Sequence, residues 1–285
     1  MNKYAETDLI LNKDGSVYHL NLKPENISEN IIVVGDPGRV YRVSKHFDSI
    51  QFEMNKREFI THTGTYNNKR VTVMSTGMGV DNIEIVMIEL DALFNIDLKK
   101  RTPKSKKRSL NIVRIGTSGA IQEDMKVGSQ VVSEYAIGMD NLILYYDMKH
   151  SELELELGKK LQKELGLPFA PYVVKSSDKL MEKFGQDFVL GNTITTPGFY
   201  APQGRQLRIG LKDPKFLDRI THFNHDGFWM TNFEMESSML YAQARMLGHH
   251  AISVNAILGN RARGTFSKNP YRTIDSIIGK VLDRI

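Results

Sequence analysis

NIVRIGTSGA, Asn111 to Ala120, is an apolar run that ends in glycines, and the same form recurs along the chain. It appears again in IIVVGDP (Ile31 to Pro37), VTVMSTGMG (Val71 to Gly79) and AISVNAILG (Ala251 to Gly259). Short apolar runs ended by Gly or Pro are typical of buried strands followed by tight turns. The sequence therefore predicts that these segments are strands of one largely buried sheet, each stopping at glycine.

Helical patterns alternate with these strands. Apolar residues at helical spacing follow the second strand at Ile83, Val86, Met87, Leu90, Leu93 and Phe94. A second helix is expected from Ser151, where Ser-x-x-Glu to Glu154 forms a capping box. A third is expected from about Asn232 to Leu247, with Gly248 as its C-cap. Strands that alternate with amphipathic helices predict a sheet covered by helices, and we expect one domain over residues 1–285.

Composition narrows the class of protein. The 285 residues are 41% hydrophobic and 25% charged, without an apolar window long enough to span a membrane. The first residues hold no apolar signal segment, and cysteine is absent. Disulfides, thiol nucleophiles and thiolate metal sites are therefore excluded. We expect a cytoplasmic globular protein.

The net charge of +5 comes from one loop. Residues 99–108, KKRTPKSKKR, hold seven basic and no acidic side chains, and without them the net charge is −2. Blocks of like charge repel and stay open, which favours a solvated, mobile connection between two elements. A contact between this loop and a polyanion is the less favoured alternative. Binding to nucleic acid is therefore not the expected function.

The loops at the carboxyl ends of such strands are where ligands bind in α/β sheets. GDPGR (Gly35 to Arg39) can present backbone N–H groups and a guanidinium to an oxyanion, or it can be a simple turn with a solvent-facing arginine. It matches neither a P-loop nor a dinucleotide fingerprint, so ATP and NAD are not indicated. Arg114 near a strand end needs either a ligand or an ion-pair partner, and Thr117 adds a hydroxyl beside it.

NFEMESS (Asn232 to Ser238) places Glu234 and Glu236 at the expected helix start. Negative charge there suits the helix dipole, and that is one interpretation of either residue. The other is a carboxylate that accepts hydrogen bonds from both ribose hydroxyls. His222 and His225, with Asp226, could be spaced for a metal, but no cluster supports them, and surface or packing histidines are the favoured interpretation. The adjacent pair His249 and His250 is interpreted in the same way.

FYAPQGRQLR (Phe199 to Arg208) combines aromatic rings with an amide and a guanidinium. Gln203 can both donate and accept, and Arg205 offers a planar set of donors. This combination suits a small heterocycle with alternating carbonyl and N–H groups.

The order HLNL, GDPGR, REF, STGMG, RIGTSGAI, FYAPQGR, NFEMES and GNR, over residues 17–263, resembles the nucleoside phosphorylase family. The Gln-x-Arg pair resembles the uracil-reading element of its uridine-specific branch. The resemblance implies a three-layer α/β/α fold with a central mixed β-sheet flanked by helices. It also implies phosphorolysis of uridine to uracil and ribose 1-phosphate, in pyrimidine salvage, with inorganic phosphate as co-substrate and no other cofactor.

Carried over by position, the resemblance assigns site residues in three groups. Phosphate is expected at Gly35, Arg39, Arg114 and Thr117, with Arg57 from a neighbouring subunit. Ribose is expected at Thr117, Met235 and Glu236, with His19 from that neighbour, and the base at Phe199, Gln203 and Arg205. Arg39, Arg114, Arg205 and Glu236 would be the catalytic residues. The protein is thus expected to be a homo-oligomer, either a dimer or a trimer of dimers.

The chain also departs from the family pattern. Some relatives hold a potassium ion with the glutamate of REF, here Glu58, and a serine, but this chain has Asp81 and Asn82 after STGMG. The departure therefore leaves undecided whether a cation binds at Glu58. A purine nucleoside phosphorylase or a nucleosidase of the same fold is the alternative activity, although NAILGNR lacks the acid expected of the purine enzymes. A non-catalytic RNA-binding role for the basic loop is the other alternative.

Overall fold

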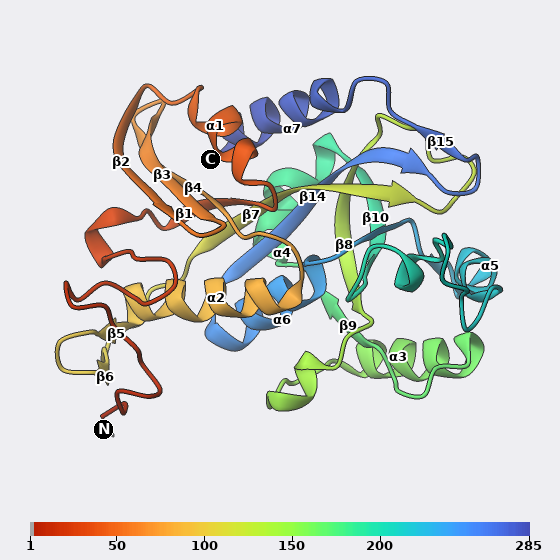
Figure 1. Ribbon diagram of the computed structural model, residues 1–285, viewed down its shortest axis with the longest axis horizontal. Coiled ribbons are helices and arrows are strands. Elements are labelled where there is room, and N and C mark those ends of the chain that lie inside the picture. Colours follow the sequence, from red (N-terminus) through yellow and green to blue (C-terminus); the bar gives the residue numbers. More distant parts are fainter. Residues whose placement is uncertain (1–2) are drawn as a thin grey trace.

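A mixed β-sheet forms the centre of the computed structural model, which describes residues 3–285 (Figure 1). Its strand order is β15-β14-β8-β10-β13-β7-β1-β4-β3-β2, with β9 paired to β8. Because β14 pairs with both β7 and β8, the strands β7, β13, β10, β8 and β14 close into a ring. Parallel and antiparallel pairs both occur in it, so the predicted mixed sheet is confirmed.

The strands of this sheet are β1 (Asn30–Val34), β2 (Ser49–Lys56), β3 (Phe59–Tyr66), β4 (Lys69–Ser75), β7 (Asn111–Ala120), β8 (Gln130–Gly138), β9 (Tyr172–Lys175), β10 (Val189–Thr195), β13 (Asn232–Glu234), β14 (His250–Asn260) and β15 (Thr265–Phe266). Two small hairpins add β5 (Ile96–Asp97) with β6 (Thr102–Pro103), and β11 (Asn224–His225) with β12 (Phe228–Trp229). The helices are α1 (Pro37–Ser44), α2 (Val80–Asn95), α3 (Glu152–Leu165), α4 (Asp178–Phe184), α5 (Phe216–His222), α6 (Ser237–Leu247) and α7 (Pro270–Arg284).

Helices cover both faces of the sheet, with α1 and α7 on one side and α2 and α6 on the other (Figure 1). Successive side chains of a strand point to opposite faces, so β1 contributes to both cores. Ile31 and Val33 pack in the core beneath α2 and α6, whereas Ile32 and Val34 pack in the core beneath α1, α4 and α7. A strand buried on both faces reads as a continuous apolar run, and the sequence showed such a run.

Most predicted elements are confirmed. β1, β4, β7 and β14 lie where the apolar runs placed strands, and α2 carries the predicted apolar face. Ser151 caps α3 with the predicted capping box to Glu154, and α6 ends at Gly248, whose φ of 76° is left-handed. Two expectations are wrong. β7 and β14 continue through their glycines, and residues 232–234 form strand β13 because they pair with β10 and β7.

The basic loop is tied to the end of α2 rather than wholly solvated. Lys104 donates through Nζ to the carbonyl of Phe94 at 2.8 Å, and Lys107 donates to the carbonyl of Asn95 at 3.1 Å. Carbonyls in the last turn of a helix lack partners within the helix and carry partial negative charge. Lys104 and Lys107 therefore cap the end of α2, whereas residues 105–109 are exposed, in line with the predicted solvated connection. Over residues 3–285, no helix has the length and apolar character that a membrane span requires.

Candidate active site

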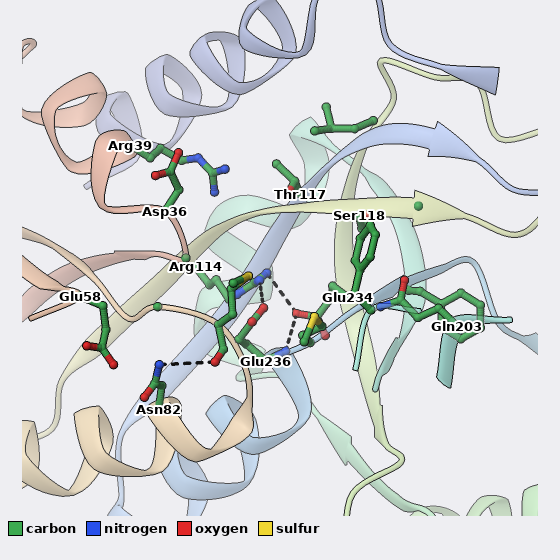
Figure 2. Close-up of a pocket in the computed structure, with 18 of the residues that line it drawn as sticks. Asp36, Arg39, Glu58, Asn82, Arg114, Thr117, Ser118, Gln203, Glu234 and Glu236 are labelled. Atoms are coloured by element: carbon green, nitrogen blue, oxygen red, sulfur yellow. Dashed lines mark hydrogen bonds and ion pairs between the residues drawn. The ribbon is translucent and has the colours of Figure 1, made fainter. Parts of the chain in front are cut away.

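A cavity of about 720 Å³ opens where several parallel strands end (Figure 2). Residues from the loops after β1, β4 and β10, from β7, and from the junction of β13 with α6 line it. Most residues singled out in the sequence belong to this lining: Gly35, Arg39, Glu58, Arg114, Thr117, Phe199, Gln203, Met235 and Glu236. Segments far apart in the sequence therefore meet at the strand ends, as expected for a sheet of this kind.

Two buried arginines approach one end of the cavity. Arg39 lies in the first turn of α1, whose N-cap Asp36 accepts a hydrogen bond from Gly38, and its Nη1 donates to the carbonyl of Ile115 at 3.1 Å. Burial, together with the like charge of Arg114, lowers the pKa of the Arg39 guanidinium. Adjacent buried cations repel each other, and a bound oxyanion would relieve that repulsion. This end of the cavity can therefore hold an anion such as phosphate.

Arg114 is paired with both glutamates of the NFEMESS segment (Figure 2). Its Nη1 lies 3.1 Å from Glu234, and its Nη2 contacts Glu236. Burial works against the charged form, but Glu236 and Glu234 outweigh it and raise the pKa of the Arg114 guanidinium. Arg114 lies within β7 rather than near its end, so the expectation that placed it at the strand end is wrong. Arg114 both forms the ion pair that was one alternative and lines the cavity, where a ligand can reach it.

Gly116 makes room for the Arg114 side chain. A Cβ atom at this position would lie 1.9 Å from Nη1 of Arg114 and 2.4 Å from Oδ1 of Asn255. Any side chain there would displace the guanidinium, which donates to Asn255 Oδ1 at 2.9 Å. The glycine inside strand β7 is thus explained by the close approach of a buried arginine.

Glu234 and Glu236 have different roles. Glu234 accepts from the backbone N–H groups of Glu236 and Ser237 at 3.0 Å and from the hydroxyl of Thr195 at 2.6 Å. It therefore caps the start of α6, which agrees with the helix-dipole interpretation for this residue. Glu236 accepts from the backbone N–H of Gly79 at 2.7 Å and reaches the cavity beside Met235. Both carboxylates line the cavity, but only Glu234 accepts from the backbone N–H groups at the start of α6.

The opposite end of the cavity carries the amide and the aromatic ring. Gln203 is buried, its Nε2 donates to Thr196 Oγ1 at 2.9 Å, and its Oε1 accepts from Arg205 Nη1. The Arg205 guanidinium stacks on the Phe199 ring, with Cζ 3.8 Å from the ring centre. Arg205 itself lies behind Gln203 and outside the cavity lining. The amide, guanidinium and ring of FYAPQGR are therefore brought together as predicted, with Gln203 facing the ligand space.

Arg261 lies beside Arg205, outside the cavity lining, and the sequence reasoning assigned it no role. Its Nη2 donates to the carbonyl of Gly204 at 3.0 Å, and it lies close to Arg205. Burial, and the like charge of Arg261, lower the pKa of the Arg205 guanidinium to about 10. Negative charge placed near these two cations would relieve their repulsion. The signal was present, because Arg261 closes the GNR motif.

Arg57 and His19 lie outside this cavity but close to each other. The Arg57 guanidinium is 6.0 Å from the centre of the Tyr18 ring, and that ring packs edge-on against His19. Arg57 is exposed and has a left-handed φ of 54°. Both residues expected from a neighbouring subunit thus lie near each other and outside the lining of this cavity, although Glu58, next to Arg57, does line it.

Glu58 is the residue at which the sequence left a monovalent cation as a possibility. Glu58 lines the cavity with Asn82, and both lie against Gly77, where a Cβ would meet Asn82 Nδ2 at 2.5 Å. Across the described part of the chain, no three His, Asp or Glu side chains are grouped as metal ligands. Glu58 and Asn82 offer oxygen atoms, and a monovalent cation there stays a prediction.

Comparison with known proteins agrees with this geometry. The family model described as the phosphorylase superfamily matches residues 29–276. The chain is 27% identical over 268 residues to a uridine phosphorylase of Thermococcus kodakarensis, covering 94% of this chain and 86% of that protein. It is 28% identical over 273 residues to the DeoD-type purine nucleoside phosphorylase of Bacillus cereus, covering 93% of this chain and 97% of that protein.

A solved structure is similar over almost the whole length. The nucleoside phosphorylase of Trypanosoma brucei, whose structure is described as showing uridine phosphorylase activity, superposes with a TM-score of 0.89 at 29% identity. The match covers 98% of this chain and all of that one. The resemblance read from the motifs is therefore confirmed at the level of family and fold.

Proposed function

The chain belongs to the phosphorylase superfamily, and we propose that it catalyses the phosphorolysis of uridine. An oxygen of inorganic phosphate attacks C1′ of the nucleoside while the bond from C1′ to N1 of uracil breaks. The bonding electrons leave with the base, which takes up a proton, and the products are ribose 1-phosphate and uracil. No redox partner is needed, and phosphate is the co-substrate.

The observation that carries this proposal is the buried amide of Gln203, held between Thr196 and Arg205 across the cavity from Arg39 and Arg114. An anion at the arginines and a heterocycle at the amide leave the ribose between them, beside Met235 and Glu236. Such an arrangement holds the nucleophile and the leaving group on opposite sides of the sugar, as an in-line displacement requires.

Each part of the site then supports one need of the reaction. Arg39 and Arg114 position phosphate and offset its charge, and Thr117 adds a hydroxyl at the same end. Glu236 would orient the sugar through its hydroxyls, exchanging its contact with Arg114 for them. Arg205, with its lowered pKa, would stabilise the negative charge that builds on uracil as the bond breaks.

The alternative activities are less well supported. A nucleosidase uses water, which does not need two buried arginines. The purine enzymes are expected to carry an acid after the last strand, whereas β14 ends with Asn260, whose Nδ2 donates to the carbonyls of Gln122 and Met125. That side chain is committed to the fold and cannot protonate a purine.

We further propose that the active site is shared between subunits of a homo-oligomer in the cytoplasm. The support is that His19 and Arg57 lie near each other and outside the lining of the cavity of their own chain. Light scattering should show a dimer or a larger assembly. A fully active monomer would contradict the assignment of both residues.

Uracil release from uridine, with and without phosphate and with inosine in parallel, tests the function. Phosphate-dependent cleavage of uridine with little cleavage of inosine is the expected result. Preferred cleavage of inosine would identify a purine enzyme, and cleavage without phosphate would identify a nucleosidase.

A further inference from the structure

We propose that Thr196 is a positioning residue, which fixes the orientation of the Gln203 amide and so makes the site select uridine over cytidine. The inference rests on the proposed function and names a determinant of its specificity. It follows from hydrogen bonds behind the ligand space rather than from the ligand space itself.

The hydrogen of the Thr196 hydroxyl is donated to a backbone carbonyl and not to the Gln203 amide. Thr196 directly follows β10 and is buried, and its backbone N–H donates to the carbonyl of Glu234 at 2.9 Å. Its Oγ1 donates to the carbonyl of Gly198 at 2.9 Å, and the carbonyl of Glu234 lies 3.4 Å away. A hydroxyl has one hydrogen, and both of these neighbours can only accept. Oγ1 is therefore left as an acceptor toward Gln203.

Because Thr196 Oγ1 can only accept here, the Gln203 amide must turn its nitrogen toward it. Gln203 Nε2 donates to Thr196 Oγ1 at 2.9 Å. On its other side, Gln203 Oε1 accepts from Arg205 Nη1, and a guanidinium has donors only. Two unrelated neighbours thus select the same orientation. Because Gln203 is only 2% exposed, a reversed amide would leave both contacts mismatched without water to replace them.

The fixed amide presents a defined pattern to the base. A free lone pair of Oε1 and the second hydrogen of Nε2 remain for the ligand. The edge of uracil offers a donor, N3–H, next to a carbonyl acceptor, and this matches the pattern. Cytosine has an unprotonated N3 next to an amino group, so its N3 would face Oε1 without a hydrogen between them. A reversed amide would suit cytosine instead, and Thr196 opposes the reversal together with Arg205.

The test compares Thr196→Val with Thr196→Ser. Valine keeps the size and branching of the side chain but removes the hydroxyl, whereas serine keeps the hydroxyl and serves as the matched control. The measured quantity is kcat/KM for uridine divided by kcat/KM for cytidine, each with saturating phosphate. This ratio does not depend on the fraction of enzyme that folds, because both substrates are assayed with the same preparation. Where cytidine turnover is too slow, the ratio of the dissociation constants of cytosine and uracil replaces it.

We expect Thr196→Val to lower the selectivity ratio by about tenfold or more, the size of one hydrogen bond to a buried group. Thr196→Ser should stay within about threefold of the wild type. An unchanged ratio in Thr196→Val, in an enzyme that cleaves uridine, would overturn the inference and leave the proposed function intact. An equal fall in both variants would also overturn it, because the hydroxyl would then not be responsible. A wild type that does not cleave uridine with phosphate refutes the function and this inference together.

Discussion

Replacing Arg205 by alanine tests whether the base end of the site takes part in the chemistry. The side chain makes contacts that alanine cannot make: Nη1 donates to the carbonyl of Phe199 at 2.5 Å and to Gln203 Oε1, and the guanidinium stacks 3.8 Å from the Phe199 ring centre. Its removal takes away positive charge near the leaving group and one of the two contacts that hold Gln203.

The expected magnitude follows from these contacts. Removing one donor that stabilises charge in a transition state costs about 3 kcal/mol, and each ~1.4 kcal/mol is a tenfold change in rate. We therefore expect kcat/KM for uridine to fall by roughly 100-fold or more in Arg205→Ala. Arg261 keeps some positive charge nearby, which sets a limit to the loss.

The assay is phosphate-dependent uracil release, with two further variants beside Arg205→Ala. Arg208→Ala removes an exposed arginine of the same loop and should leave kcat/KM unchanged within about twofold. Arg205→Lys keeps the charge but loses the planar fork, so it should recover only part of the activity. Circular dichroism checks that all variants fold. A change below about threefold in Arg205→Ala would refute the role of this residue in the reaction.

Three further predictions concern other parts of the molecule. Glu89 accepts hydrogen bonds from His19 Nδ1 at 2.7 Å and from the backbone N–H of His19. Glu89→Gln should therefore lower kcat/KM about tenfold for uridine but not for 5′-deoxyuridine, which lacks the hydroxyl that His19 would meet. Equal losses of kcat/KM on both substrates would contradict this prediction. Arg39→Met should raise the KM for phosphate about tenfold or more in steady-state kinetics while the KM for uridine changes little, and the reverse pattern would remove Arg39 from the phosphate site. Burial opposes the charge of Glu154, but Arg245 at 2.7 Å and the backbone N–H groups of Ser151 and Lys175 outweigh it and lower the pKa of its carboxyl. The stability from Glu154 is therefore present above its ordinary pKa of 4.5 and is lost as pH falls below that value. In denaturant unfolding at pH 7, Glu154→Gln should be less stable than the wild type by about 1–2 kcal/mol, and the difference should shrink in acid. A difference that does not change with pH would contradict the ionic contribution.

The sequence allowed the site to be located but not fully assembled. Gly35, Arg39, Thr117, Gln203 and Glu236 line the predicted cavity, because their motifs follow strands whose ends meet at one edge. The contribution of Arg261 was missed, although it closes the GNR motif, because its position beside Arg205 depends on the fold and not on the motif. The expected roles of His19 and Arg57 need a second subunit, which a single chain cannot supply.

Local physical rules decided the elements that the sequence determined by itself. The apolar run of β1, the capping box at Ser151 and the left-handed Gly248 depend on hydrogen bonds and packing within a few residues, so they can be recognised in the chain. Only the tertiary structure decided that residues 232–234 form a strand and that Arg114 pairs with Glu236. These outcomes depend on partners from distant segments, such as β7 beside β13, and burial makes an unpaired charge too costly to tolerate. The sequence motifs thus determined which side chains the site contains. The pairing of strands from distant segments decided which of these side chains face the ligand.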